Sequence, residues 1–144
     1  MKVRRGLRAP LRRRVLQAHA LITGVAGIVL IARPAAIPAT IGIELVPAAY
    51  LLSYLLAAAE FGFASLSWMA ARSPDGPAVR LAMVACLVLH GASALLETIV
   101  WSSRGSPVLL VNIIARLFIA GVFLSLLPRS DESGGSFALP DDER

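Results

Sequence analysis

Charged residues and cysteine are scarce in this chain of 144 residues. Only 16% of the residues are charged and 57% are apolar, whereas ordinary soluble domains are about 25% charged and about 45–50% apolar. The composition therefore excludes the soluble globular class. Cys86 is the one cysteine, which excludes an intrachain disulfide, a CxxC redox pair and a cysteine-based zinc site. The H-E-x-x-H, G-x-G-x-x-G, P-loop and G-x-S-x-G motifs are also absent, so motifs predict no reaction.

Long apolar runs are the main feature that the sequence does have. A helix needs about 20 residues to cross roughly 30 Å of hydrocarbon, and four runs of that size are separated by Pro, Gly and charged residues. Strand-type alternation is absent, and a span in lipid must satisfy its own backbone hydrogen bonds. We predict an all-α, integral membrane four-helix bundle over residues 15–127, with spans at about 15–32, 48–71, 79–101 and 108–127.

Two polar segments flank this predicted transmembrane domain. Residues 1–14 form a basic arm that holds seven of the 14 Lys and Arg residues. Residues 128–144 form an acidic tail with little to bury, which we expect to be disordered and cytoplasmic. The connection from Arg33 to Pro47 is longer than the other two and still apolar. We expect it to lie along the membrane interface or over the helix ends, where it could act as a lid.

Basic residues are unequally divided between the two sides of the predicted bundle. The arm, the loop with Arg72 and Arg80, and the tail face one side, and only Arg33 and Arg104 face the other. Cytoplasmic loops of membrane proteins are enriched in Lys and Arg. We therefore expect both termini in the cytoplasm and a multi-pass protein of the bacterial plasma (inner) membrane. The arm has neither a folded basic surface nor stacking aromatics, so nucleic acid is not an expected partner.

One alternative concerns the first span. Gln17 and His19 shorten its uninterrupted apolar run to Ala20–Ala32, which is the length of a signal-peptide core behind a basic segment. Cleavage would leave three helices, but the small residues that follow give no clean A-x-A site.

Polar groups inside the spans are the candidates for function, because an ionisable residue in a bilayer costs about 2.5–3.5 kcal/mol. Helical spacing sorts them by face. On the third span His90 and Glu97 share a stripe with Cys86 and Ser93, and on the fourth Asn112 and Arg116 share one. On the second span Glu60 lies on a face of small residues, Ser53, Ala57, Ala64 and Ser67. The candidates for ligand binding or proton relay are Glu60, His90, Glu97, Asn112 and Arg116, on stripes that must face one another or water, not lipid.

The charges of these candidates do not balance. Glu60 and Glu97 against Arg116 leave one excess negative charge, which a proton, a cationic His90 or a cationic ligand would relieve. The open alternative is a structural network, in which Arg116 bridges both carboxylates and fixes the helix register.

Other polar and small residues receive structural interpretations. We expect His19 to extend to the membrane interface at the basic end of the first span. Gly24 and Gly27 are expected at close helix contacts. Trp68 and Trp101 are expected to be interface anchors.

Three functional hypotheses follow. The first is an intramembrane polar pocket, built from Glu60, His90, Glu97 and Arg116, that binds a small amphipathic ligand. The second is an intramembrane acid–base enzyme, an isomerase or cyclase acting on a lipid-soluble substrate. The third is a structural or accessory membrane subunit. The expected partners are the lipid bilayer and the ligand, and a homo-oligomer or a membrane-protein partner stays open. We predict no metal site and no cofactor, because haem or zinc held by His19 and His90 alone would be poorly ligated.

The order of features resembles the small four-helix bacterial membrane proteins of the DoxX-like and related uncharacterised families. The resemblance rests on the basic N-terminus, a first helix that ends at Ala32-Arg33-Pro34, the Ile41-Gly42-Ile43 stretch, and Glu60 within the second of the four helices. It covers most of Val15 to Leu127. It implies a four-helix bundle and accessory roles in redox or small-molecule metabolism, with no set of catalytic residues. Asn112 and Arg116 depart from that pattern. The small multidrug transporters have an essential acid in the first helix, which this chain lacks.

Overall fold

The computed structural model describes residues 3–74 and 76–128. The described chain contains four long helices, α1 (Val3–Ala32), α3 (Tyr50–Arg72), α4 (Pro77–Arg104) and α5 (Pro107–Leu126), and two short ones, α2 (Ala36–Thr40) and the 3-10 helix η1 (Pro47–Ala49). Four segments are long and apolar enough to cross a membrane, namely Arg8–Ala32, Pro47–Arg72, Pro77–Ser103 and Pro107–Leu126. The predicted all-α fold with four long apolar helices is confirmed.

The basic segment at the N-terminus belongs to the first helix. Because α1 begins at Val3, the predicted arm continues from that residue into the first span without a break. The predicted acidic tail of residues 128–144 lies, apart from Pro128, outside the described residues.

Local sequence signals fix the turn between α4 and α5. Gly105 has a φ of +64°, which is the left-handed conformation that commonly ends a helix. The backbone N–H of Leu109 donates to Ser106 Oγ at 3.4 Å, and Pro107 occupies the first helical position of α5. So short a turn makes α4 and α5 antiparallel neighbours.

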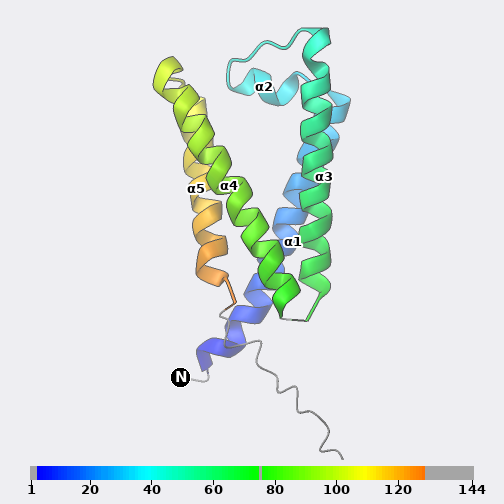
Figure 1. The fold of residues 1–144 in the computed structure, drawn as a ribbon, viewed down its shortest axis with the longest axis vertical. Coiled ribbons are helices and arrows are strands. Elements are labelled where there is room, and N and C mark those ends of the chain that lie inside the picture. Colours follow the sequence, from blue (N-terminus) through cyan, green and yellow to red (C-terminus); the bar gives the residue numbers. More distant parts are fainter. Residues whose placement is uncertain (1–2, 75, 129–144) are drawn as a thin grey trace, which may run out of the picture.

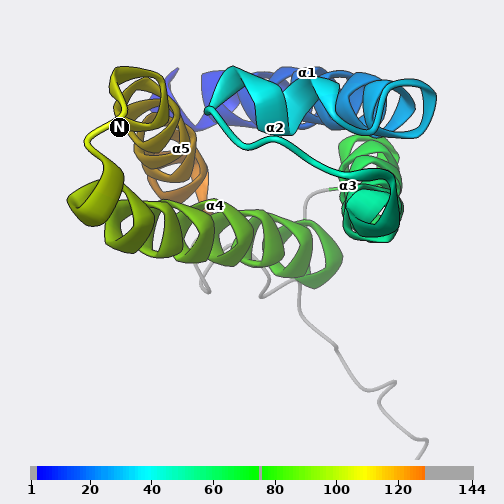
Figure 2. The ribbon, with the colours of Figure 1, turned by 90° about the horizontal axis from the view of Figure 1, so that it is seen from above.

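The four long helices form two antiparallel pairs, α1 with α3 and α4 with α5. The pairs come together toward the end of the molecule that carries the N-terminus and diverge toward the other end (Figure 1). We call these the closed end and the open end. Viewed from above, α1 and α4 lie on opposite sides of the molecule, and α3 and α5 lie on the other two (Figure 2). The connection that contains α2 lies at the open end, between the two pairs.

The main apolar core lies at the closed end. It contains buried residues of all four long helices: Leu16, Ala70, Ala71, Val79, Ala82, Met83, Cys86, Phe123 and Leu126. At the open end a smaller cluster, Ala94, Leu109 and Ile113, lies within the α4/α5 pair, and Ile41 of the connection packs against it. The connection therefore touches the α4/α5 pair at the open end, where the two pairs themselves have separated.

The α1/α3 pair is held together by a close backbone approach. A Cβ atom on Gly27 would lie 3.1 Å from the Phe61 ring and 3.3 Å from the carbonyl oxygen of Ala57. A Cβ there would force Phe61 or the α3 backbone to shift by a few tenths of an ångström, so Gly27 lies at a close helix contact, as predicted.

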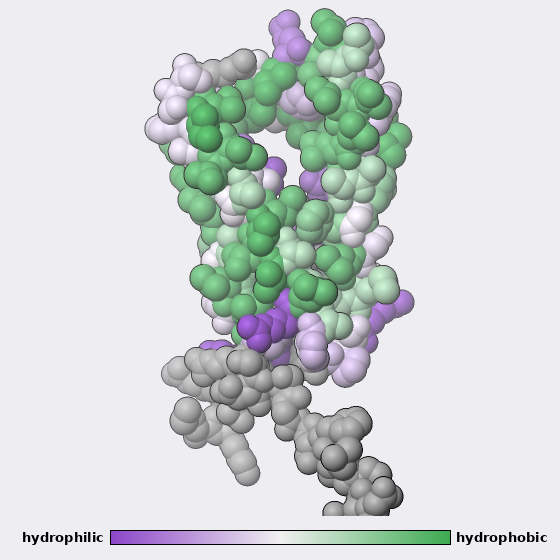
Figure 3. All heavy atoms as spheres, in the orientation of Figure 1, coloured by the Kyte–Doolittle hydropathy of each residue, from purple (hydrophilic) through white to green (hydrophobic). Residues whose placement is uncertain are grey.

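The outer surface is apolar, as a lipid-facing surface must be. Leu21 of α1, Met69 of α3 and Phe118 of α5 are 69%, 68% and 72% exposed, and apolar side chains dominate the face shown in Figure 3. Large exposed residues of this kind indicate contact with lipid when they cover four helices of membrane-spanning length.

Candidate functional site

Two polar clusters lie between the helices, one above the other. The lower one, which we call the histidine chain, consists of His19, Ser67, Cys86 and His90. The upper one, which we call the carboxylate cluster, consists of Glu97, Asn112 and Arg116. Glu60 lies on α3 and belongs to neither.

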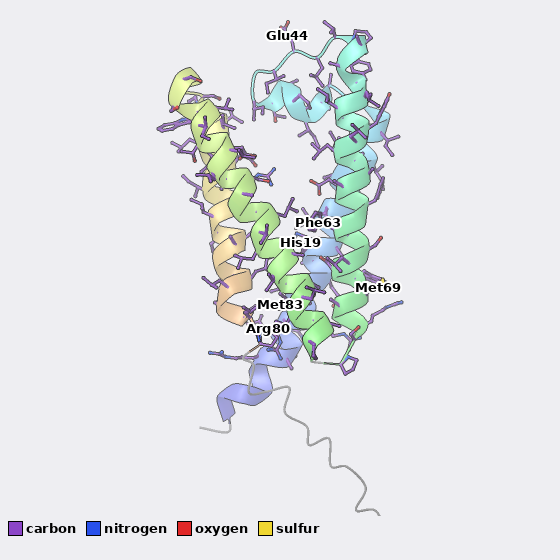
Figure 4. The ribbon with its side chains drawn as sticks, viewed as in Figure 1. His19, Glu44, Phe63, Met69, Arg80 and Met83 are labelled. Carbon is purple, nitrogen blue, oxygen red and sulfur yellow. The ribbon has the colours of Figure 1, made fainter. Side chains whose placement is uncertain are left out.

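The histidine chain crosses between the two helix pairs. Nε2 of His19 (α1) lies 2.9 Å from Nε2 of His90 (α4), and Nδ1 of His19 lies 2.8 Å from Ser67 Oγ (α3). Ser67 Oγ is in turn 3.5 Å from Cys86 Sγ. His19 and His90 are each only 6% exposed, and Ser67 and Cys86 are fully buried. Figure 4 shows His19 where α4 comes close to α1.

Aromatic packing holds the two imidazole rings in place. Their ring centroids are 5.1 Å apart and the ring planes are nearly perpendicular, at 85°. The ring of Phe123 stacks on His90 at 6.3 Å and meets His19 edge-on at 5.2 Å. Because Phe123 is fully buried, the α5 helix fixes the geometry of a hydrogen bond that it does not itself make.

The histidine chain allows two self-consistent arrangements of its protons when both imidazoles are neutral. If His19 Nε2–H donates to His90, then Ser67 donates to His19 Nδ1. If His90 Nε2–H donates to His19, then His19 Nδ1–H donates to Ser67 and Ser67 donates to Cys86. In either arrangement His90 Nδ1 is buried and has no hydrogen-bond partner among the described residues.

The structure corrects the interpretation of His19. We expected it to extend to the interface, yet it is buried and bonded to two other helices. A signal for this was present, since Leu16, Thr23 and Gly27 lie three, four and eight residues from His19 on one helix face, and all are buried. The same stripe of α1 therefore packs against the bundle, and a histidine on it cannot reach the surface.

The carboxylate cluster lies entirely within the α4/α5 pair. Asn112 Nδ2 donates to both carboxylate oxygens of Glu97, each at 3.0 Å. Arg116 Nε lies 2.7 Å from Glu97 Oε1, a charge–charge contact in which the N–H is not aligned for a hydrogen bond. The shared stripe predicted for Asn112 and Arg116 thus meets Glu97 of the neighbouring helix.

Glu60 faces the carboxylate cluster from the other pair. The α3 face predicted to carry it turns inward, since Ser53, Ala57 and Ser67 are buried and Glu60 is half-buried. Among residues 3–74 and 76–128, however, no hydrogen bond or ion pair reaches Glu60.

A groove at the open end exposes the carboxylate cluster to the outside. Its volume is about 590 Å³, within the range of about 300–1,000 Å³ that small-molecule sites occupy. Its apolar walls include Ile37, Ile41 and Leu45 of the connection, Leu52 and Leu56 of α3, and Val111 of α5. Its polar lining includes Ser53 and the whole carboxylate cluster. Figure 3 shows a hollow between the two pairs with polar side chains on its walls.

The five predicted site residues therefore fall into separate places. Glu97, Asn112 and Arg116 come together and line the groove. Glu60 lies on α3, in the other helix pair, and does not line the groove. His90 belongs to the histidine chain instead, bonded to His19 and not to a carboxylate. Within the described part of the chain, no group of three or more His, Cys, Asp or Glu side chains is placed to hold a metal ion.

No known protein family, curated protein or solved structure matches this chain. The resemblance to the DoxX-like families therefore has no support, and the function has to be argued from the groove and its polar groups.

Proposed function

We propose that this chain is a multi-pass protein of the bacterial plasma membrane whose groove binds a small amphipathic ligand. The observation that carries the proposal is the groove itself, with apolar walls from three elements and one polar cluster set into them. Ligand sites between helices of a bundle have this composition, because apolar walls give affinity and a few polar groups give orientation.

The proposed orientation places both termini in the cytoplasm. At the closed end, the described basic residues include Arg8, Arg13 and Arg14 of α1. Arg72 and Arg80, on either side of the turn between α3 and α4, lie there too. At the open end, the connection contains one basic residue, Arg33, and one acidic residue, Glu44. The positive-inside rule then puts the closed end in the cytoplasm, so the groove faces the opposite side of the membrane.

The connection between α1 and α3 is placed to control access to the groove. Ile37, Ile41 and Leu45 of the connection form one wall. The Ser53 hydroxyl donates to the carbonyl oxygen of Pro34 at 2.7 Å, which ties the start of the connection to α3. Gly42 has a φ of +73°, a conformation that favours glycine and sharply turns the chain. The connection thus serves as a lid with one fixed end.

A groove-filling substitution tests the proposal. Ala115 lines the groove on α5 and is exposed to it, so Ala115→Phe is expected to occupy the ligand's space. Ala92→Phe is the matched control, because Ala92 is exposed on α4 away from the groove. Native mass spectrometry of protein extracted from its own membrane should show a bound small molecule in the wild type and in Ala92→Phe, and none in Ala115→Phe. Equal occupancy in all three proteins would contradict the proposal.

One observation favours a second candidate, acid–base catalysis on a lipid-soluble substrate. His90 Nδ1 is buried without a partner among the described residues, and the chain behind it can exchange protons through His19 and Ser67. A general base needs a free nitrogen of this kind. Catalysis would require turnover of an added isoprenoid that is lost in His90→Gln but retained in Cys86→Ser, which keeps a hydrogen-bonding side chain at the far end.

A further inference from the structure

The groove and its surroundings contain one carboxylate more than they can pair. Glu97 is satisfied twice, by Arg116 Nε at 2.7 Å and by Asn112 Nδ2 at 3.0 Å to each of its oxygens. This pair is neutral as a unit and lies within α4 and α5. Glu60 on α3 is left over, since no hydrogen bond or ion pair within the described residues reaches it.

Arg116 contacts Glu97 and not Glu60 in this structure. Its Nε lies 2.7 Å from Glu97 Oε1 within the α4/α5 pair, whereas Glu60 lies on α3 of the other pair. An unpaired carboxylate within a membrane-spanning helix is costly, so a mobile cation that joins it is favoured. An anionic ligand would have to break the Glu97–Arg116 contact and would then face two carboxylates.

Glu60 does not line the groove itself, but it follows two residues of the same helix that do. Leu56 and Ser53, which line the groove, precede Glu60 by four and seven residues on the same helix. These spacings keep all three on one face, and four residues correspond to about 6 Å along the axis. A cationic head at Glu60 therefore leaves an apolar body against Leu56, Leu52 and the connection.

We propose that the ligand of this groove is a monocationic amphiphile, and that Glu60 is its counter-ion. The inference rests on the proposed function and adds the charge of the ligand to it. The single charge follows from the single unpaired carboxylate. The chemical class is an amine or quaternary ammonium that carries an apolar body short enough for a groove of about 590 Å³.

Three ligands with the same octyl group separate the contribution of charge to binding from that of hydrophobicity. Octyltrimethylammonium, octanol and octanoate carry charges of +1, 0 and −1. Binding is measured by isothermal titration to the full chain in phosphatidylcholine nanodiscs, with empty nanodiscs subtracted for partition into lipid. We expect saturable binding of octyltrimethylammonium, roughly tenfold or more tighter than that of octanol, with octanoate weakest.

Substitutions assign the effect to Glu60. Glu60→Gln should weaken octyltrimethylammonium roughly tenfold or more and leave octanol unchanged, while Glu60→Asp, which keeps the charge, should retain most of the affinity. Glu44→Gln is the matched control, because Glu44 is an exposed acidic residue on the connection (Figure 4) and does not line the groove. Circular dichroism of each variant shows that the helices are intact.

The outcomes distinguish this inference from the proposed function. If octanol or octanoate binds as tightly as the cation and Ala115→Phe removes that binding, the groove is a ligand site but the charge assignment is overturned. The charge assignment is likewise overturned if Glu60→Gln binds the cation as the wild type does. If none of the three ligands binds above empty nanodiscs, the proposed function fails together with the inference.

Discussion

The closed and open ends of this molecule differ in where their polar groups find partners. At the closed end the partners lie on different helix pairs, since His19 of α1 bonds to His90 of α4. At the open end they lie within one pair, since Glu97, Asn112 and Arg116 are all on α4 and α5. A polar group satisfied within its own pair does not draw the other pair toward it. The groove can stay open because the charges of the carboxylate cluster are already paired on one wall.

The largest loss of stability is expected from a substitution of Phe123, which tests whether the core lies at the closed end. Its side chain is fully buried, belongs to the closed-end core and touches both imidazoles. Phe123→Ala should destabilise the protein by about 3 kcal/mol, the low end for a buried Phe, because lipid replaces water as the alternative environment. Phe118→Ala, 72% exposed on the same helix, should change little. Reversible unfolding in mixed micelles measures both, and equal losses would mean that the closed end is not the core.

The His19–His90 bond should give the next largest effect. His19→Ala or His90→Ala each leaves a buried nitrogen without its partner, which costs about 1–3 kcal/mol. In a double-mutant cycle the two should couple by about 1 kcal/mol, within the range found for polar pairs between membrane helices. His19 and Asn112, which lie in different clusters, should be additive. Additivity of the two histidines would show that they do not join the pairs.

A smaller loss of stability is expected at the close contact between α1 and α3. Gly27→Ala places a Cβ 3.1 Å from the Phe61 ring and should destabilise by about 1 kcal/mol. Gly62→Ala is the control, because a Cβ there meets nothing within 4 Å, and higher helix propensity should leave stability unchanged or slightly raised. The same unfolding assay applies. A stabilising Gly27→Ala would mean that the two helices are not in close contact at this level.

The fold could be predicted from the sequence because lipid leaves the backbone few options. Runs of about 20 apolar residues must be helices, and Gly105, Ser106 and Pro107 mark the sharpest turn. Helical spacing also predicted which residues share a face, as for Ser53, Ala57 and Ser67 on α3.

The partners between helices could not be predicted in this way, because spacing along one helix does not give the height or rotation of its neighbour. His90 and Glu97 share a stripe of α4, yet one contacts α1 and the other α5. The divergence of the pairs, which separates those two contacts, arises from packing across all four helices. The prediction for His19 was wrong for a related reason: its nearness to the basic residues outweighed its register with the buried Leu16 and Thr23.

The smallest effect should come from Asn112, and it sharpens the comparison most directly. Asn112→Leu removes both hydrogen bonds to Glu97 but keeps a side chain of the same branched shape, while Arg116 still neutralises the carboxylate. The loss should be about 0.6 kcal/mol, the average for interhelical hydrogen bonds in a membrane protein. The His19–His90 coupling energy should be unchanged in this background, since the two clusters hold different interfaces. A changed coupling would show that the open and closed ends act as one polar network, so that a ligand at the groove would be felt at the histidine chain.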